Sequence, residues 1–216
     1  GDPADVIIND AANGKRAFNI TSADAVISGL TISGTGFNGD GHGGHITMSA
    51  GTVENCVIRD GQIGANSYSK YYGANVHMSG GRLVRCHVLN GLLNPLGGAS
   101  GYGGIYAGGT AVVESCLVSG NRASSSCSCT GTGVYLDGSA KLVNSTVVAN
   151  QVTQNTPYGG VYVNSTGASV ANTVMFDNGG TAENEFGKQN LGCYGYCASS
   201  VANEECATWR VIADAA

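Results

Sequence analysis

The sequence predicts an all-β protein, a parallel β-solenoid of about six to seven coils that ends in a Cys-rich irregular segment. Three observations support this fold class. A six-residue apolar pattern recurs at nearly constant spacing, a short alternating strand precedes each copy, and no segment of about 12 or more residues has helical periodicity. Short strands without a crossover helix cannot bury their apolar faces alone, whereas stacked similar coils can.

The recurring pattern is apolar, two variable residues, apolar or small, one variable residue, apolar. We interpret each copy as one long strand whose first and fourth positions face the interior. The fourth positions are Leu30, Cys56, Cys86, Cys116, Thr146 and Thr173, which gives steps of 26, 30, 30, 30 and 27 residues. The first positions form a second inward column, Ile27, Val53, Leu83, Val113, Val143 and Val170.

A shorter strand precedes every copy. Apolar and β-branched residues alternate in it with polar or aromatic ones, and Gly, Asn and Ser bound it, as is typical of strands. A third, weaker strand is expected near Ile63, Leu92-Leu93 and Val152, with Val6 to Ile8 as the same element of an earlier turn. The predicted short strands are 18–20, 46–48, 76–78, 105–107, 134–136 and 161–163.

Turn residues separate these strands. Glycine pairs such as Gly43-Gly44 and Gly103-Gly104 precede the short strand and fit a corner that needs positive φ. Asn or Asp follows the long strand, where the chain must turn and a side-chain amide can cap neighbouring coils. We predict that these residues share one column, Asp60, Asn90, Asn121, Asn150 and Asn178.

The glycine openings and the closing motifs together resemble a known group. The closing motifs are Val118-Ser-Gly-Asn121, Val147-Val-Ala-Asn150 and Met175-Phe-Asp-Asn178. Over residues 18–178 the chain is similar to the repeats of polymorphic outer-membrane proteins and other secreted right-handed parallel β-helix proteins. The resemblance implies a right-handed coil and a bacterial surface or secreted protein, often an adhesin. It implies no catalytic residues.

Length and composition restrict the domain organisation and the partners. The 216 residues are expected to form a solenoid over 1–178 and a Cys-rich segment over 179–216 that packs on or caps it. Only 12% of residues are charged and the net charge is -5, so nucleic acid is a poor partner. No apolar stretch approaches the ~20 residues of a membrane-spanning helix. The chain opens at Gly1 without Met, which we interpret as a processed product or an excised fragment.

Eight cysteines favour an oxidising compartment. Cys56, Cys86 and Cys116 would stack at ~4.8 Å, and their Cβ atoms would lie farther apart than the ~3.8 Å of a relaxed disulfide. We interpret them as buried free thiols that fill space. The remaining five are disulfide candidates with open connectivity, and a zinc site built from the first four is the alternative. These five are Cys127, Cys129, Cys193, Cys197 and Cys206.

Two groups of residues have the chemistry of a catalytic site. Glu54 and Glu114 face outward with Arg59, Arg85 and His87 nearby, the residue types that a lyase acting on uronate polymers would use. No two carboxylates share a column on adjacent coils, as a two-carboxylate glycosidase would require. A solvated polar face is therefore the favoured interpretation.

The second group lies within one loop. Asp40, His42 and His45 fall within six residues and suit zinc, copper or nickel. A polar, glycine-rich loop is the simpler interpretation, because nothing in the sequence indicates supporting ligands. We expect no metal and no cofactor.

The outward position of the short strand gives the clearest candidate surface. Its members are Asn19, Thr47, His77, Tyr106, Tyr135 and Tyr162. One interpretation is a stabilising ladder beneath the loops 64–73 and 94–102. The other is an amphipathic platform, formed by His77 and the three tyrosines, for glycan rings or a neighbouring subunit.

The leading functional hypothesis is a non-enzymatic, extracellular or cell-surface structural or adhesive protein. Solenoid ends expose unpaired strand edges, so end-to-end assembly into a fibre or filament is part of this hypothesis. The alternatives are a polysaccharide lyase or glycoside hydrolase, and a glycan-binding module, on the same scaffold. The expected partners are further copies of the chain, other surface proteins and glycans.

Overall fold

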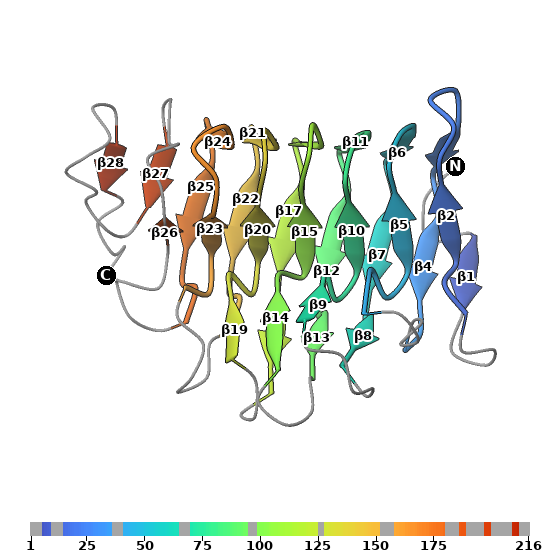
Figure 1. Ribbon diagram of the computed structural model, residues 1–216, viewed down its shortest axis with the longest axis horizontal. Helices are drawn as coiled ribbons and strands as arrows, with labels where there is room; N and C mark the ends of the chain where they lie inside the picture. Colours follow the sequence, from blue (N-terminus) through green and yellow to red (C-terminus); the bar gives the residue numbers. More distant parts are fainter. Residues whose placement is uncertain are drawn as a thin grey trace.

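A computed structural model shows that the chain forms a parallel β-solenoid (Figure 1). The structure describes residues 6–9, 15–35, 41–64, 70–94, 99–124, 128–151, 158–179, 186–188, 197–199 and 209–211. Within these ranges every strand pairing is parallel and no helix occurs, which confirms the predicted fold class. About five turns stack along the axis, and further strands extend the sheets at both ends.

All six predicted short strands are confirmed. They stack in register as one sheet, and the middle residue of each strand points outward while its neighbours face the core. In the described residues this seven-stranded sheet consists of β2 (Phe18–Ile20), β5 (Ile46–Met48), β10 (Val76–Met78), β15 (Ile105–Ala107), β20 (Val134–Leu136), β23 (Val161–Val163) and β26 (Phe186–Lys188).

The predicted long strand is two strands with a corner between them. The corner residue has positive φ, as at Asn55 (52°), Arg85 (49°) and Ser115 (54°). The corner interrupts the alternation of side chains, so two inward positions lie three residues apart instead of two. Val53 and Cys56 are therefore both buried.

Strands before the corner form a six-stranded sheet and those after it a nine-stranded sheet, within the described ranges. The first contains β3 (Val26–Ser28), β6 (Thr52–Glu54), β11 (Arg82–Val84), β16 (Val112–Glu114), β21 (Lys141–Val143) and β24 (Ser169–Ala171). The second contains β1 (Ile7–Asn9), β4 (Thr31–Ser33), β7 (Val57–Arg59), β12 (His87–Leu89), β17 (Leu117–Ser119), β22 (Thr146–Val148), β25 (Val174–Phe176), β27 (Cys197–Ser199) and β28 (Trp209–Val211). Because β1 pairs with β4, it belongs to this sheet and not to the weaker third strand.

Two predicted inward columns are wrong at the fifth copy of the pattern. The counterpart of Cys116 is Ser145, 29 residues later, so this turn is one residue shorter than the 30-residue step assumes. A shift of one residue exchanges the two faces of a strand. Leu142 and Ser145 are therefore buried, whereas Val143 and Thr146 are half-exposed.

Cys56, Cys86 and Cys116 are buried free thiols, as predicted. Their Sγ atoms lie 3.1, 3.3 and 3.2 Å from the carbonyl oxygen two residues earlier. The Ser145 hydroxyl donates to the equivalent carbonyl at 2.8 Å. The column therefore satisfies a carbonyl at each corner as well as filling space.

Buried asparagines form a ladder along the axis. The Nδ2 of Asn75 donates to Oδ1 of Asn121 at 3.1 Å, Asn121 to Asn150 at 2.9 Å, and Asn150 to Asn178 at 2.8 Å. All four side chains are fully buried. The single predicted column of turn residues is wrong in part, because the ladder includes the unpredicted Asn75.

The other two members of the predicted column lie one position earlier. Asp60 (φ 67°) and Asn90 (φ 55°) occupy the corner itself, where Gly120 and Ala149 stand in later turns. The ladder position after this corner is Gly91 in the turn that contains Asn90. Gly91 has no side chain, and the amide of Asn75, which precedes the short strand β10, occupies the space where one would lie. A Cβ at Gly91 would be only 2.6 Å from Asn75 Nδ2.

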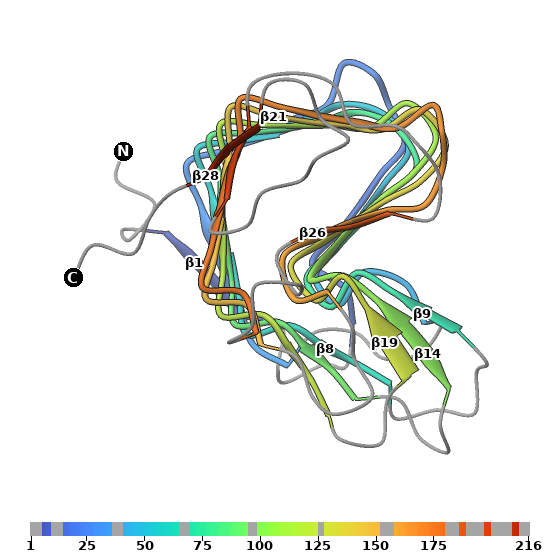
Figure 2. The ribbon, with the colours of Figure 1, turned by 90° about the vertical axis from the view of Figure 1, so that its left-hand side faces the viewer.

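A side lobe extends from the main coil and has its own core (Figure 2). One of its sheets contains β8 (Gln62–Ile63), β13 (Leu92–Leu93) and β18 (Arg122–Ala123), which confirms the third strand at two predicted places. The other contains β9 (Lys70–Tyr72), β14 (Ser100–Tyr102) and β19 (Ser128–Thr130). The lobe core consists of Ile63, Tyr71, Ala74, Leu93, Ala123 and Cys129. Val152 lies outside the described residues.

The described parts of 179–216 continue existing sheets. β26 pairs with β23, β27 with β25, and β28 with β27. The boundary near residue 178 and a capping role stay predictions. No helix in the described part of the chain is long and apolar enough to cross a membrane.

Candidate functional site

The outward column of the seven-stranded sheet contains a continuous stack of four rings, at positions that the sequence predicts. His77, Tyr106, Tyr135 and Tyr162 are in register on four successive strands. Their ring centroids are 5.1, 5.5 and 5.3 Å apart, with interplanar angles of 12°, 14° and 26°. Near-parallel rings in series cover one another's faces, so this column does not offer a row of open faces for stacking sugars.

A second ring column lies on the lobe and was missed from the sequence. The His42 and Tyr72 rings are 5.1 Å apart at 8°, and the Tyr72 and Tyr102 rings are 5.3 Å apart at 25°. Each ring directly precedes a glycine, His42-Gly43, Tyr72-Gly73 and Tyr102-Gly103, and Tyr158-Gly159 repeats the signal. An aromatic residue followed by glycine, just before each short strand, is the sequence pattern that would have identified this column.

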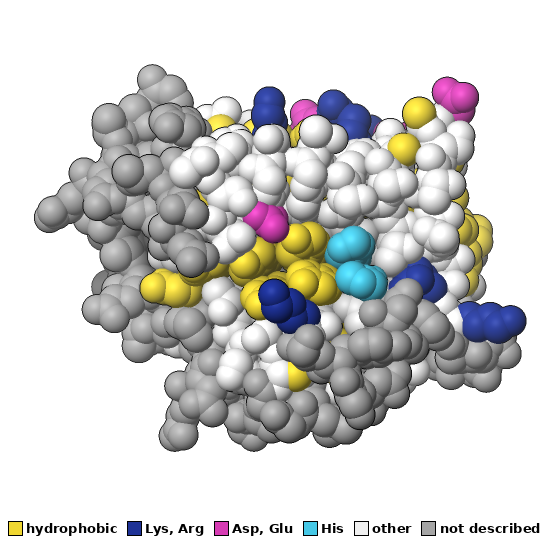
Figure 3. Space-filling view, in the orientation of Figure 1, with side chains coloured by type: hydrophobic (Ala, Val, Ile, Leu, Met, Phe, Trp, Pro, Cys, Tyr) yellow, Lys and Arg dark blue, Asp and Glu magenta, His cyan; other side chains and the backbone are white. Residues whose placement is uncertain are grey.

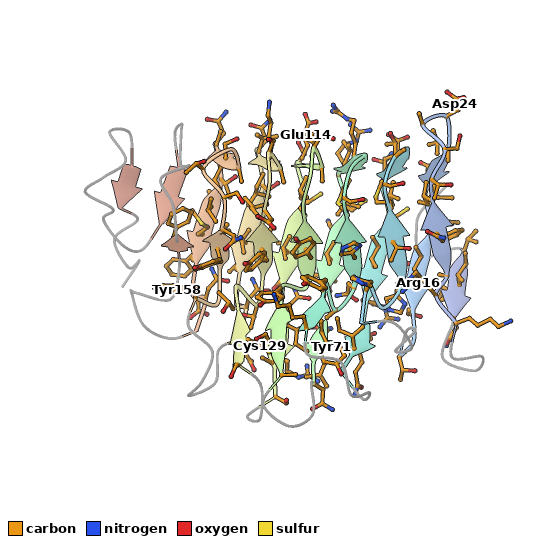
Figure 4. The ribbon with its side chains drawn as sticks, in the orientation of Figure 1. Arg16, Asp24, Tyr71, Glu114, Cys129 and Tyr158 are labelled. Atoms are coloured by element: carbon orange, nitrogen blue, oxygen red, sulfur yellow. The ribbon has the colours of Figure 1, made fainter. Side chains whose placement is uncertain are left out.

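The two columns interlock. Tyr72 meets Tyr106 edge to face with centroids 4.8 Å apart, and Tyr102 meets Tyr135 at 4.7 Å. Such aromatic pairs contribute about 0.5–1.5 kcal/mol each, so the rings also fasten the lobe to the main coil. We call the eight rings the aromatic strip: His42, Tyr72, Tyr102, Tyr158, His77, Tyr106, Tyr135 and Tyr162. Figures 3 and 4 show it crossing the centre of one face along the solenoid axis.

Asp137 anchors one side of the strip. Its carboxylate accepts hydrogen bonds from the Gly138 N–H (2.9 Å), Asn164 Nδ2 (3.0 Å), the Tyr106 hydroxyl (3.0 Å) and the Ser165 hydroxyl. Burial alone would raise the pKa of Asp137, but these hydrogen bonds outweigh it and lower the pKa below its ordinary value. The group stays ionised and surrounded by donors.

The Asp137 network is expected to lose its stabilising effect in acid. Because the folded pKa of Asp137 lies below the ordinary value of 3.8, its contribution is complete above that value and is lost as pH falls through the folded pKa. Denaturation of the wild type and Asp137→Asn from about pH 2 to pH 6 measures this. The stability difference should be constant above about pH 5 and shrink in acid. A difference that does not vary with pH contradicts the prediction.

A pocket of about 280 Å³ adjoins the N-terminal end of the strip. Its lining includes His42 and His77, the first rings of the two columns, together with Arg16, Asn19 and Thr47. Figure 4 labels Arg16 on this side of the molecule, toward the N-terminal strands. The further lining residues in the described part are Met48, Ser49 and Ser79.

The predicted acid–base face consists of ion pairs. Arg85 pairs with Glu54 at 3.1 Å and Arg82 with Glu114 at 2.5 Å, and both arginines are exposed. Exposed pairs of this kind contribute little to stability, about 0–1 kcal/mol each. The arrangement agrees with the solvated-face interpretation, because each carboxylate is held by a guanidinium.

Asp40, His42 and His45, the triplet weighed as an alternative metal site, do not come together in the part of the chain that the structure describes. His45 is fully buried with Nε2 2.9 Å from the Arg59 carbonyl oxygen, whereas His42 lies on the aromatic strip. Asp40 lies outside the described residues. Among those described, no group of three His, Cys, Asp or Glu residues is arranged to hold a metal ion.

Of the five disulfide candidates, Cys129 alone has a described side chain. It is fully buried in the lobe core and is not one of the free thiols. Cys127, Cys193 and Cys206 lie outside the described residues, as does the side chain of Cys197. Pairing among the five stays a prediction.

Comparison with known proteins gives no match. No family model, curated protein or solved structure matches this chain. The resemblance to polymorphic outer-membrane proteins therefore stays a prediction, and functional inference depends on the geometry of the strip and its pocket.

Proposed function

We propose that the protein is a non-enzymatic binding protein of the cell surface or extracellular space that holds an extended, hydroxyl-rich polymer, a glycan, along the aromatic strip. The observation that carries the proposal is the pair of interlocked ring columns, one with rings on four successive turns and the other with rings on three. A site that repeats along the solenoid axis suits a ligand that repeats along its own length.

The chemistry of the strip favours hydroxyl groups as ligands. Burial raises the pKa of Tyr106 and Tyr135 well above the ordinary value, so their hydroxyls stay protonated at any physiological pH. The Tyr106 hydroxyl already donates to Asp137, which leaves its oxygen as an acceptor. Since neighbouring rings cover the ring faces, the ligand is held chiefly by hydrogen bonds and ring edges.

Three of the described acidic residues support a binding role over catalysis. Four donors surround the carboxylate of Asp137, which contacts the strip through the Tyr106 hydroxyl. Glu54 and Glu114 are paired with arginines on a different sheet. A general base needs an acceptor within reach of the substrate proton, and these three carboxylates are engaged by protein donors.

Tyrosine hydroxyls on the strip are expected to contribute directly to binding. The hexaoses of cellulose, xylan, chitin, mannan and polygalacturonate are first screened on an array, and the best binder is measured by calorimetry. Tyr72→Phe combined with Tyr102→Phe should weaken it about tenfold or more, since each lost hydrogen bond is worth about 1 kcal/mol.

Tyr71→Phe is the matched control. Tyr71 shares β9 with Tyr72 but is fully buried in the lobe core, so its substitution should leave affinity unchanged. Failure of all five hexaoses to bind, or equal effects of the two sets of variants, would refute the proposal. Shortened products in the bound samples would favour the lyase or hydrolase instead.

End-to-end assembly is a second candidate, favoured by the apolar surface of the first strands. Val6, Ile7 and Val26 are 51%, 58% and 59% exposed, and the first strands of two sheets carry Ile7 and Val26. Uncovered apolar strand edges recruit further chains. Sedimentation velocity over a range of concentrations tests it, and a constant monomeric coefficient would exclude it.

A further inference from the structure

We infer that the pocket at the N-terminal end of the aromatic strip is a subsite for one pyranose ring, the terminal unit of the chain that the strip holds. The inference rests on the proposed function for the identity of that chain. The pocket itself is defined by Arg16, Asn19, Thr47, His42 and His77.

The size of the pocket limits its ligand to a small molecule. Sites for drug-sized ligands have volumes of about 300–1,000 Å³, and this pocket has about 280 Å³. One sugar ring is a reasonable occupant, whereas an oligosaccharide must extend beyond the pocket. The strip adjoins the pocket and gives the oligosaccharide a surface along which to extend, because His42 and His77 belong to both.

The lining is more polar than that of a typical small-molecule site. Such sites are mostly apolar with a few polar groups, whereas Met48 is the one aliphatic side chain in the described lining. Hydroxyl, amide, imidazole and guanidinium groups make up the rest. A ligand that bears a hydroxyl on nearly every carbon can satisfy such a lining, because these side chains supply both donors and acceptors.

The ring stack ends at this pocket. In register before His77 stand Thr47 and then Asn19, neither of which is aromatic. A flat imidazole at the end of a stack, flanked by hydrogen-bonding side chains, gives a sugar both a surface for its C–H face and partners for its hydroxyls. This is the stacking arrangement that the interior of the strip does not offer.

Two further contacts order the polar groups in advance. The guanidinium of Arg16 donates from Nε to the Gly43 carbonyl oxygen at 2.8 Å and from a terminal nitrogen to the His42 carbonyl oxygen. The Thr47 hydroxyl donates to Asn19 Oδ1 at 3.0 Å, which orients the amide nitrogen of Asn19 as a donor. Groups fixed before binding lose less entropy when the ligand arrives.

A second pocket, of about 200 Å³, provides a contrast. It is lined by Asn55, Cys56, Val57, Arg85 and His87. There Arg85 is engaged by Glu54 at 3.1 Å and by Asn55 at 2.9 Å, and no described ring stack reaches the pocket. His87 in this pocket therefore serves as an internal reference for sugar binding at His42 and His77.

The four histidines allow a test by NMR on the full chain. Glucose, galactose, N-acetylglucosamine and glucuronate are titrated to millimolar concentrations while the four imidazole signals are followed. We expect at least one sugar to shift the His42 and His77 signals saturably, with His45 and His87 unchanged. Equal shifts at all four histidines, or none at any, would overturn the inference.

Variants separate the pocket from the strip. Thr47→Val with Ser79→Ala should weaken the effective monosaccharide at least fivefold, whereas Arg122→Gln, an exposed change on β18, should not. Unchanged affinity in the pocket variant would overturn the inference. Binding of a hexaose that depends on Tyr72 and Tyr102 without any shift at His42 or His77 would refute the pocket and leave the proposed function standing. Saturable shifts without hexaose binding would support the pocket and refute the proposed function.

Discussion

Asn121→Leu is expected to lower the free energy of unfolding by about 3–5 kcal/mol. The Asn121 side chain accepts from the Gly91 N–H at 2.9 Å and from Asn75, and it donates to Asn150. Leucine has a similar volume but no polar side-chain atoms, so four buried groups lose a partner at once: the Gly91 N–H, the amides of Asn75 and Asn150, and the Val88 carbonyl. Each unsatisfied buried group costs about 1–3 kcal/mol.

Urea denaturation measures the effect of Asn121→Leu, with Asn19→Leu as the control. Asn19 is exposed, and its side chain accepts a hydrogen bond from Thr47. Its substitution should change stability by less than about 1 kcal/mol. A loss at Asn121 no larger than that at Asn19 would show that the buried ladder is not a source of stability.

Gly91→Asn is expected to destabilise the protein by about 3 kcal/mol, and Asn75→Gly in the same chain should restore at least half of that loss. A Cβ at Gly91 would lie 2.6 Å from Asn75 Nδ2 and 2.7 Å from Asn121 Oδ1. Gly91 does not have positive φ, so space and not backbone conformation excludes a side chain. Removing the Asn75 side chain opens that space.

The next turn already has glycine and asparagine in the opposite positions. There Gly104 stands in the place of Asn75, and Asn121 fills the space where a Cβ at Gly104 would come within 2.3 Å. The double variant should therefore rebuild the ladder, with the amide supplied by residue 91 instead of residue 75. Denaturation of the wild type, both single variants and the double variant gives the coupling energy, expected to be at least about 2 kcal/mol. Additive losses would show that the two positions do not share one space.

Strand-level features followed from the sequence. Alternation over three residues defined the short strands 18–20 to 161–163, and their equal spacing placed His77 and three tyrosines in one outward column. Both depend on the fixed period of a strand and on the stacking of similar coils. The free, buried state of Cys56, Cys86 and Cys116 followed from the same spacing.

Features that depend on contacts between distant segments did not follow. The corner at Asn55 and its equivalents divides one apparent strand into two. It was not predicted, although the three-residue step between the inward positions Val53 and Cys56 marks it. The one-residue shortening before Ser145 reversed the expected faces of Val143 and Thr146. The second ring column on the lobe required the lobe itself, whose core is separate from that of the main coil.

By itself, then, the sequence determined which residues form strands, that the strands stack in parallel, and that aromatic side chains line one outward column. The tertiary structure alone decided where each coil turns its corners, that Asn75 enters the ladder from the opposite wall, and that His42, Tyr72 and Tyr102 join the column to form the strip. The physical reason is range. The alternation of side chains within a coil depends on residues that are close in sequence. The space left by Gly91 or filled by Tyr72 depends on residues one or more turns away.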